Sequence, residues 1–377
     1  MALPKLEEYR EQVRSFIQTE GEAFARQLDA EKRIPDGLLK RLRELGLMRL
    51  TFPREYGGEG LRLQEYFPIL EECAKSHGTI RILVHGVNTM WRPMSYARKP
   101  LKDRWLTAIA AGEAIPAFAL TEPDTGTGAD IGTTAVRRGD TYYLTGNKHL
   151  ITFADIADVF TVVACTDRSK GGAGISAFLV ERNTPGFSMT MMPEMMGMKG
   201  SEHGILEFRE APVPAGNLLG EEGQGLEIVL RGFLDQSRAA IAQSCVGIAQ
   251  RSLELAADFT KQRVTFGKPI AERQAIQMML AEMATGIHAG RLLVMDAARR
   301  FDAGQPLAKE AAMAKVFCLE MVGEVTDRAL RIFGGRGLTT AYPIERLYRD
   351  ARALWFEEGT AEIQKTVIAR EVLYGHP

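Results

Sequence analysis

The expected secondary structure changes twice along the 377 residues, from helix to strand and back to helix, and this pattern constrains the fold more than any other feature. Up to about residue 115, leucines recur at three- and four-residue spacing, as in LLKRLRELGLMRL, and this periodicity predicts amphipathic helices. Residues 116–220 read as short strand-like pieces with hairpin turns predicted at Gly139-Asp140 and Gly146-Asn147. Residues 221–377 return to long helical blocks that would pack as a bundle. The order predicts an α+β chain with a β-rich middle.

Composition excludes several classes of protein. The length suggests two or three packed units, and 45% hydrophobic with 25% charged residues is typical of a soluble globular chain. A net charge of -1 argues against a nucleic-acid partner. No apolar run reaches the length of a membrane span, and the charged start MALPKLEEYREQVRSF is unlike a signal peptide.

The cysteines and histidines are scattered. The four cysteines form no C-x-x-C pair and lie in apolar surroundings, which predicts reduced, buried thiols in a cytoplasmic protein. The six histidines show no ligand spacing, so we expect no structural metal.

The stretch FEEGTAEIQK, residues 356–365, places two carboxylates before a glycine and a predicted helix start. One explanation is local: Thr360 would be the N-cap, and the helix dipole favours Glu357 and Glu358 near the N-terminus. The other is a catalytic base on a short loop. The residues alone leave both explanations open.

Three other stretches have the composition of ligand-binding loops. AFALTEPDTGTGAD (117–130) is rich in Thr and Gly but matches neither a Walker loop nor G-x-G-x-x-G, and an ordinary loop entering a sheet explains it equally. In RVTFGKPIAERQAIQ (263–277), Arg263 could hold a phosphate and Phe266 could cover an aromatic ring, or the stretch is a turn between helices. RIFGGRG (331–337) fits a glycine helix end as well as a ligand loop.

In combination these segments resemble the acyl-CoA dehydrogenase family over nearly the whole chain. The matching segments, in family order, are FPREYGGEGL, ALTEPDTGTGAD, GNKHLIT, MGMKGSEHGILEF, VPAGNLLGEEGQG, RVTFGKPI, IFGGRG, YRDAR and EEGTAEIQ. The resemblance implies an N-terminal all-α domain (1–115), a middle antiparallel β domain (116–220) and a C-terminal four-helix bundle (221–377). It further implies a homotetramer that binds FAD between the β domain and the bundle, with a neighbouring subunit contributing.

The implied reaction is α,β-dehydrogenation of an acyl-CoA thioester to the 2,3-enoyl-CoA, with electrons passing to an electron-transfer flavoprotein. Counted from YRDAR, Glu358 aligns with the general base that removes the α-proton while hydride leaves the β-carbon for FAD N5. Burial beside Trp355 and Phe356 would raise the pKa of this carboxyl from about 4.3 toward neutrality. Some similar enzymes carry the base on the helix containing LDQSR, where this chain has Ser237, which cannot serve.

The resemblance also assigns binding positions. Those for the cofactor are Phe118, Leu120, Thr121, Thr127, Leu150, Thr152, Arg263, Phe266, Gln274, Arg331, Gly334, Gly335, Thr360 and Glu362. Those for the substrate are Thr127, Asp235, Arg238 and Gly359. For Asp235 and Arg238 the alternative is a solvated helix face.

Four positions depart from the family pattern. Leu150 replaces a tryptophan that packs on the flavin, Phe153 an asparagine, Arg331 a glutamine and Glu357 a tyrosine. Glu357 either faces solvent or the substrate entrance, or faces the pocket, where it would raise the pKa of Glu358 or recognise a polar acyl group.

These departures bear on the acyl group, open between straight, branched, alicyclic and dicarboxylic chains, more than on the reaction class. Leu150 keeps open an enoyl-CoA reductase, an oxidase or a flavin monooxygenase on the same fold. A third interpretation is a non-catalytic helical interaction protein with a decayed site.

Overall fold

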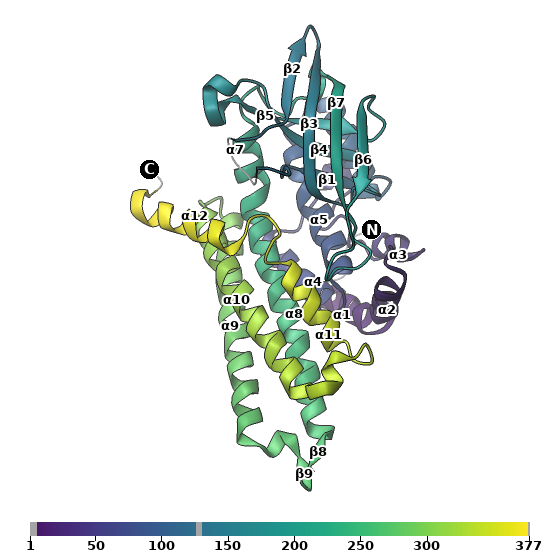
Figure 1. Cartoon of the computed structure of the whole chain (residues 1–377), viewed down its shortest axis with the longest axis vertical. Helices are drawn as coiled ribbons and strands as arrows, with labels where there is room; N and C mark the ends of the chain where they lie inside the picture. Colours follow the sequence, from purple (N-terminus) through teal and green to yellow (C-terminus); the bar gives the residue numbers. More distant parts are fainter. Residues whose placement is uncertain (1–5, 126–129, 376–377) are drawn as a thin grey trace.

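The computed structural model describes residues 6–125 and 130–375, in which a sheet caps one end of a long helical bundle (Figure 1). The N-terminal helices are α1 (Leu6–Phe16), α2 (Glu22–Glu31), α3 (Leu38–Glu44), α4 (Leu63–Ala74), α5 (Gly78–Met94) and α6 (Lys99–Ala111). A π-helical turn, Ile17–Gly21, joins α1 to α2. Every residue of α5 except Arg92 is buried, so this helix runs through the interior of the molecule.

The middle region is a sheet of seven strands among the described residues. The strands are β1 (Pro116–Ala119), β2 (Thr134–Arg138), β3 (Thr141–Thr152), β4 (Val159–Cys165), β5 (Ile175–Glu181), β6 (Phe187–Met191) and β7 (His203–Pro214). Their order is β1-β4-β2-β3-β7-β6, with β5 paired to β4. Most pairings are antiparallel, while β1 and β2 each pair with β4 in parallel.

One of the two predicted hairpin turns is present and the other is not. Gly139-Asp140 joins β2 to β3 as expected. Gly146-Asn147 lies within β3, where the register against β7 shifts at a bulge, so the predicted turn is wrong. Gly146 has φ +146°, and a Cβ there would lie 2.6 Å from the Cα of Thr133. The glycine is needed for a close backbone approach at a bulge instead of a turn.

The C-terminal region is helical. Its helices are α7 (Gly225–Val229), α8 (Asp235–Gln262), α9 (Gln274–Asp302), α10 (Ala308–Phe333), α11 (Ile344–Ala353) and α12 (Ala361–Tyr374). A π-helical turn, Leu230–Leu234, makes α7 and α8 continuous. The small hairpin β8 (Val264–Thr265) and β9 (Lys268–Pro269) joins α8 to α9 at the end of the bundle farthest from the sheet (Figure 1).

Short 3-10 helices occupy several connections. They are Arg54–Tyr56, Arg168–Gly174, Ala215–Asn217, Ile270–Glu272 and Gly334–Leu338.

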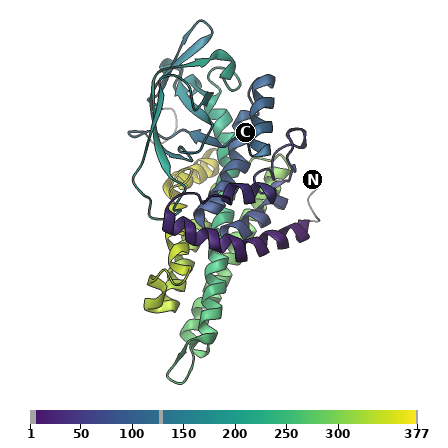
Figure 2. The ribbon, with the colours of Figure 1, turned by 90° about the vertical axis from the view of Figure 1, so that its right-hand side faces the viewer.

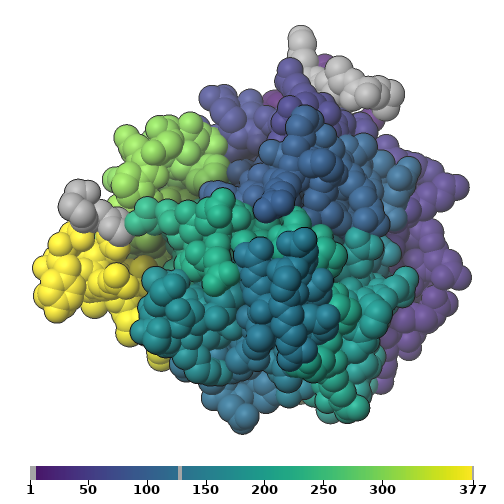
Figure 3. Space-filling model, turned by 90° about the horizontal axis from the view of Figure 1, so that it is seen from above, coloured from purple at the N-terminus to yellow at the C-terminus, as the bar shows by residue number. Residues whose placement is uncertain are grey.

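The three regions share one hydrophobic core. Figure 2 shows the N-terminal helices lying across one side of the bundle, below the sheet. Phe118 of β1 packs on Phe233 just before α8, with ring centroids 4.6 Å apart, and so joins sheet to bundle. Seen from above, α12 projects on the side opposite the N-terminal helices (Figure 3). Within the described ranges no helix has the length and apolarity needed to cross a membrane.

The four cysteines, all within the described residues, are free and buried, as the sequence predicts.

Candidate active site

The connection between α11 and α12 carries the two carboxylates singled out in the sequence. Glu358 has φ +52° and Gly359 φ +93°, so both adopt the left-handed conformation, which is strained for a residue with a side chain. Thr360 stands at the N-cap position of α12, but its side chain makes no capping hydrogen bond. Helix capping by Thr360 therefore does not explain this conformation.

Two side chains from the bundle hold this connection instead. Buried Lys315 of α10 donates to the carbonyl oxygens of Glu357 and, at 2.6 Å, of Gly359. Gln364 of α12 donates to the carbonyl oxygens of Glu358 at 3.2 Å and of Gly359 at 3.3 Å. These bonds satisfy successive carbonyl groups and keep the strained residues in one conformation.

The two oxygens of the Glu358 carboxyl have different surroundings. Its Oε1 accepts a hydrogen bond of 2.5 Å from the Ser237 hydroxyl, whereas its Oε2 is buried without a hydrogen-bond partner. Burial raises the pKa of Glu358 to about 7, although Ser237, Lys315 and Arg238 act in the opposite direction. A carboxyl with this pKa is suited to accept a proton near neutral pH.

The expected source of this burial is only partly right. Phe356 is 66% exposed and cannot desolvate the carboxyl, so that part of the prediction is wrong. Trp355 is half-buried against α10 near Gly323. The side chains around Glu358 include Ser237 and Arg238 of α8 and Lys315 of α10. These come from distant parts of the chain, so the local sequence does not reveal them.

Glu357 points into the molecule and not toward solvent. Both carboxylate oxygens accept hydrogen bonds from fully buried Arg81 of α5, at 2.6 and 2.8 Å. Burial opposes ionisation of Glu357, but the Arg81 guanidinium holds its pKa below the ordinary value. The Glu357 charge raises the pKa of Glu358, as expected for an inward-facing residue. Because Arg81 occupies both oxygens, Glu357 is not free to recognise a polar acyl group.

The predicted substrate-binding residues that the structure describes lie beside Glu358. Asp235 and Arg238 pair at 3.0 Å, and Arg238 Nε donates to the carbonyl oxygen of Glu358 at 3.4 Å. Arg238 is buried and Asp235 half-buried, so this part of α8 is not a solvated face. Gly359 follows the carboxyl directly. Thr127 lies outside the described residues.

The predicted cofactor-binding residues of the sheet lie at strand ends. Thr152 ends β3 and shares a hydrogen bond of 3.0 Å with His203 Nε2. The carbonyl oxygen of Thr121 accepts from the backbone of His149 at 2.8 Å, which ties the segment after β1 to β3. Leu150, at φ +59°, is 47% exposed.

A buried ion pair that the sequence did not indicate supports this part of the sheet. Glu122 accepts from Lys148 Nζ at 2.8 Å and from the backbone of Gly132 and Thr133 at 2.6 and 2.9 Å. Lys148 also donates to the carbonyl oxygen of Leu120 at 3.0 Å. Glu122 lies in ALTEPDTGTGAD and Lys148 in GNKHLIT, and this membership of two matching segments was the feature of the sequence that could have indicated the pair.

The remaining predicted cofactor residues lie far from Glu358 within one chain. Arg263, Phe266 and Gln274 flank the β8–β9 hairpin, and Phe266 is 98% exposed. Phe333 at the end of α10 stacks on Phe259 of α8 with centroids 4.2 Å apart, so the following residues lie at the same end. Helix α8 has 28 residues and therefore separates this end from Ser237 by about 40 Å.

The predicted cofactor positions thus form two groups. The near group comprises Phe118, Leu120, Thr121, Leu150, Thr152, Thr360 and Glu362, and the far group comprises Arg263, Phe266, Gln274, Arg331, Gly334 and Gly335. FAD has a flat ring system at one end and a diphosphate with adenosine at the other. The donor sets fit that molecule: hydroxyls and an exposed apolar side chain near the carboxyl, and an exposed arginine with an exposed aromatic ring at the far end. A second chain would have to bring its far group to the near group.

The sequence analysis missed three residues around the carboxylates, namely Arg81, His85 and Lys315. Arg81 and His85 stand four residues apart in the apolar stretch RILVHGV, and this spacing on one helix face was the only local signal. Lys315 carried no signal because lysines are ordinary on helices.

Comparisons with known proteins agree with this architecture. Family models for the N-terminal, middle and C-terminal domains of acyl-CoA dehydrogenase match residues 4–113, 117–211 and 223–373. The chain is 39% identical to the acryloyl-CoA reductase (NADH) of Anaerotignum propionicum over 367 residues, 96% of this chain and 92% of that protein. It is 36% identical to the short-chain specific acyl-CoA dehydrogenase of Clostridium acetobutylicum, over 96% of each chain.

The fold agrees equally with a solved structure. Butyryl-CoA dehydrogenase from Megasphaera elsdenii matches with a TM-score of 0.93 and 34% identity, over 99% of each chain. The protein belongs to the acyl-CoA dehydrogenase family.

Proposed function

We propose that the protein dehydrogenates an acyl-CoA thioester to the 2,3-enoyl-CoA, with Glu358 as the general base. The observation that carries the proposal is the Glu358 carboxyl, whose pKa is raised to about 7 and whose Oε2 is buried without a partner. FAD, when bound, supplies the acceptor for the β-hydride. The α-proton passes to Glu358, while Lys315 and Gln364 keep the carboxyl in place.

The test uses flavin bleaching. A panel of saturated acyl-CoAs, comprising short, medium, branched, alicyclic and dicarboxylic chains, is added anaerobically to the purified holoenzyme. One class should bleach the flavin, and Glu358→Gln should slow bleaching by roughly 10²–10⁴-fold without loss of flavin. Glu227→Gln, a change at an exposed carboxylate on α7, is the control. A flavin that no member of the panel bleaches would refute the proposal.

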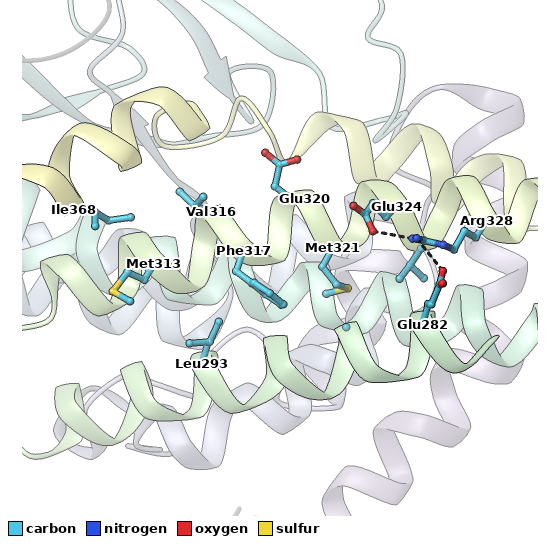
Figure 4. A pocket seen from close by; sticks show the side chains of 12 residues that line it. Glu282, Leu293, Met313, Val316, Phe317, Glu320, Met321, Glu324, Arg328 and Ile368 are labelled. Carbon is cyan, nitrogen blue, oxygen red and sulfur yellow. Dashed lines mark hydrogen bonds and ion pairs between the residues drawn. The ribbon is translucent and has the colours of Figure 1, made fainter. Parts of the chain in front are cut away.

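A homo-oligomer, proposed as a tetramer, is part of this function because one chain separates the two groups of cofactor positions. A hollow of about 490 Å³ between α9, α10 and α12 supports self-association (Figure 4). Its lining includes Leu293, Met313, Phe317 and Met321. Met313, which lines the hollow, is 41% exposed, and Leu292 on α9 is 57% exposed.

Light scattering tests the assembly. The native protein should have the mass of four chains, and Phe317→Asp should yield smaller species that lose flavin. Val136→Asp, on an exposed apolar residue of β2, is the control. A native monomer that retains flavin would contradict the proposal.

We further propose an electron-transfer flavoprotein as acceptor and the cytoplasm as location. The acceptor rests on the family resemblance. The location rests on four buried, unpaired cysteines, which suit a reducing compartment.

A second candidate function is reduction of a 2,3-enoyl thioester. Two observations favour it: a 39% identical relative is named acryloyl-CoA reductase (NADH), and Leu150 replaces the family's tryptophan. Glu358 would then return a proton to the α-carbon. An enoyl-CoA that reoxidises the reduced flavin faster than the saturated thioester bleaches it would favour the reductase.

Two remaining alternatives have direct tests. Rapid reoxidation of the reduced protein by oxygen would favour an oxidase or a monooxygenase. A colourless, flavin-free preparation would favour a non-catalytic interaction protein.

A further inference from the structure

A buried line of polar side chains leads from Glu357 to Glu358 by way of α5 and α8. Arg81 Nη1 lies 3.3 Å from His85 Nδ1, and His85 Nε2 lies 2.7 Å from Ser237 Oγ. Ser237 then donates to Glu358 Oε1 at 2.5 Å. Arg81, His85 and Ser237 are each at most 1% exposed, so no bulk water competes for these bonds.

The chemistry of the donors fixes the direction of every bond in this line. Arginine has N–H donors and no acceptor, so the Nδ1 of His85 must be the acceptor. A neutral imidazole that accepts at Nδ1 carries its proton at Nε2 and donates there. Burial and the Arg81 charge lower the pKa of His85 to about 3, which keeps the ring neutral. Ser237 Oγ therefore accepts from His85, and its single hydrogen is left for Glu358.

We propose that Arg81, His85 and Ser237 form a one-directional hydrogen-bond chain that holds Oε1 of Glu358 as an acceptor and leaves Oε2 as the oxygen that takes the substrate proton. His85 and Arg81 are positioning residues in this chain, since neither touches Glu358. The chain itself follows from geometry, while the role of Oε2 rests on the proposed function.

The chain gives a physical reason for the acidic residue beside the base. Arg81 can orient His85 only if its buried charge is balanced, and Glu357 balances it through two hydrogen bonds. The tyrosine expected at position 357 would leave that charge unpaired. Arg81, His85 and Glu357 therefore act as one unit that the local sequence around the base does not reveal.

The other charged groups around Glu358 do not replace the chain. Lys315 of α10 donates to backbone carbonyls, and Arg238 of α8 pairs with Asp235 and reaches a carbonyl oxygen. Glu357 is an acceptor. Among the described residues, Ser237 is the one side chain that donates a hydrogen bond to an oxygen of this carboxyl.

The first experiment is an infrared titration of the holoenzyme without substrate. The protonated carboxyl band of Glu358 is identified by its absence in Glu358→Gln, and its midpoint is measured in variants. Ser237→Ala removes the donor that favours ionisation, so the midpoint should rise by about one pH unit. His85→Phe should raise it in the same direction, because the Ser237 hydroxyl is then free to turn away. His85→Gln, which retains an N–H at similar reach, should restore most of the native midpoint.

The chain offers a matched control. Ser244 lies on α8 two turns after Ser237, is equally buried and donates to the carbonyl oxygen of Ala240 at 2.9 Å. Ser244→Ala should leave the midpoint unchanged. If the midpoint in Ser237→Ala equals that of the native protein, the proposal is overturned. If the midpoint rises in Ser237→Ala but is unchanged in His85→Phe, then His85 and Arg81 are not part of the chain.

The second experiment reads the tautomer of His85. In protein labelled with ¹⁵N-histidine, the signal lost in His85→Phe identifies this residue among the six histidines. A neutral ring with its proton on Nε2 supports the chain, and a proton on Nδ1 or a doubly protonated ring overturns it. Neither readout needs turnover, so a failure of the proposed function, seen as flavin that no acyl-CoA bleaches, is distinguishable from a failure of the chain.

Discussion

The two groups of predicted cofactor positions lie at opposite ends of α8 and differ in how the chain supports them. Around Glu358, Lys315, Gln364, Ser237 and Arg238 all bond to the strained connection, so one chain fixes its conformation. At the β8–β9 hairpin, Phe266 is almost fully exposed at φ +48°. The difference teaches that one chain fixes the connection around Glu358 by its own hydrogen bonds, whereas it leaves the aromatic ring at the far end uncovered.

The largest effect on stability is expected at the Arg81–Glu357 pair. Arg81→Met or Glu357→Gln leaves a buried charge without its partner and should lower the free energy of unfolding by about 3–5 kcal/mol. The double variant should recover much of that loss, because neither charge remains. Thermal unfolding at fixed protein concentration measures all three. Additive losses in the double variant would show that the two residues act independently.

The next effect concerns pH. The folded-state pKa of Glu358 is raised from 4.5 to about 7, so the folded protein favours the protonated carboxyl. The contribution of this carboxyl to the free energy of unfolding is therefore full below about pH 4.5 and is lost as pH rises through 7. Glu358→Gln should therefore be about 3 kcal/mol more stable than the native protein at pH 8–9 and equal to it near pH 4.5. Activity should change the other way, rising with pH through about 7 as the base ionises. Equal stability of the two proteins at pH 9 would contradict the raised pKa.

A smaller loss is expected at Lys315. Lys315→Met keeps the volume but removes the donors to the carbonyl oxygens of Glu357 and Gly359, at a cost of about 2 kcal/mol. The pKa of Glu358 should also rise, because Lys315 favours its ionised form. Unfolding curves and the pH profile of flavin bleaching measure the two effects. Lys309→Met, at a 42% exposed lysine of the same helix, serves as the control.

The sequence predicted the parts of the site that depend on order and spacing. Glu358 was placed by its distance from YRDAR, and Asp235 and Arg238 by the match of the stretch LDQSR. The structure brings the three together. The Arg81–Glu357 pair could not be predicted because its partners are 276 residues apart and meet only in the packed fold. The prediction of a turn at Gly146 failed for a related reason. Gly146 lies at a bulge in β3, and a bulge depends on the pairing with the neighbouring strand β7, which the local sequence does not contain.

Separation of the two groups could be inferred only from structure. The sequence analysis treated all cofactor positions as a single set. The length of α8 shows that one chain cannot bring them together.

The smallest effect on stability is expected at Phe266. A change there also tests most directly whether the two ends of α8 differ in role. Phe266→Ser should change the free energy of unfolding by less than about 0.5 kcal/mol, because a side chain that is 98% exposed contributes little to its own chain. If its ring covers part of a cofactor held by a neighbouring chain, flavin affinity should nevertheless fall roughly tenfold. Val264→Ser, on the same hairpin and 53% exposed, should change neither quantity. If both variants retain flavin equally on dilution, the far end takes no part in the cofactor site. The residues around the β8–β9 hairpin would then be ordinary exposed surface.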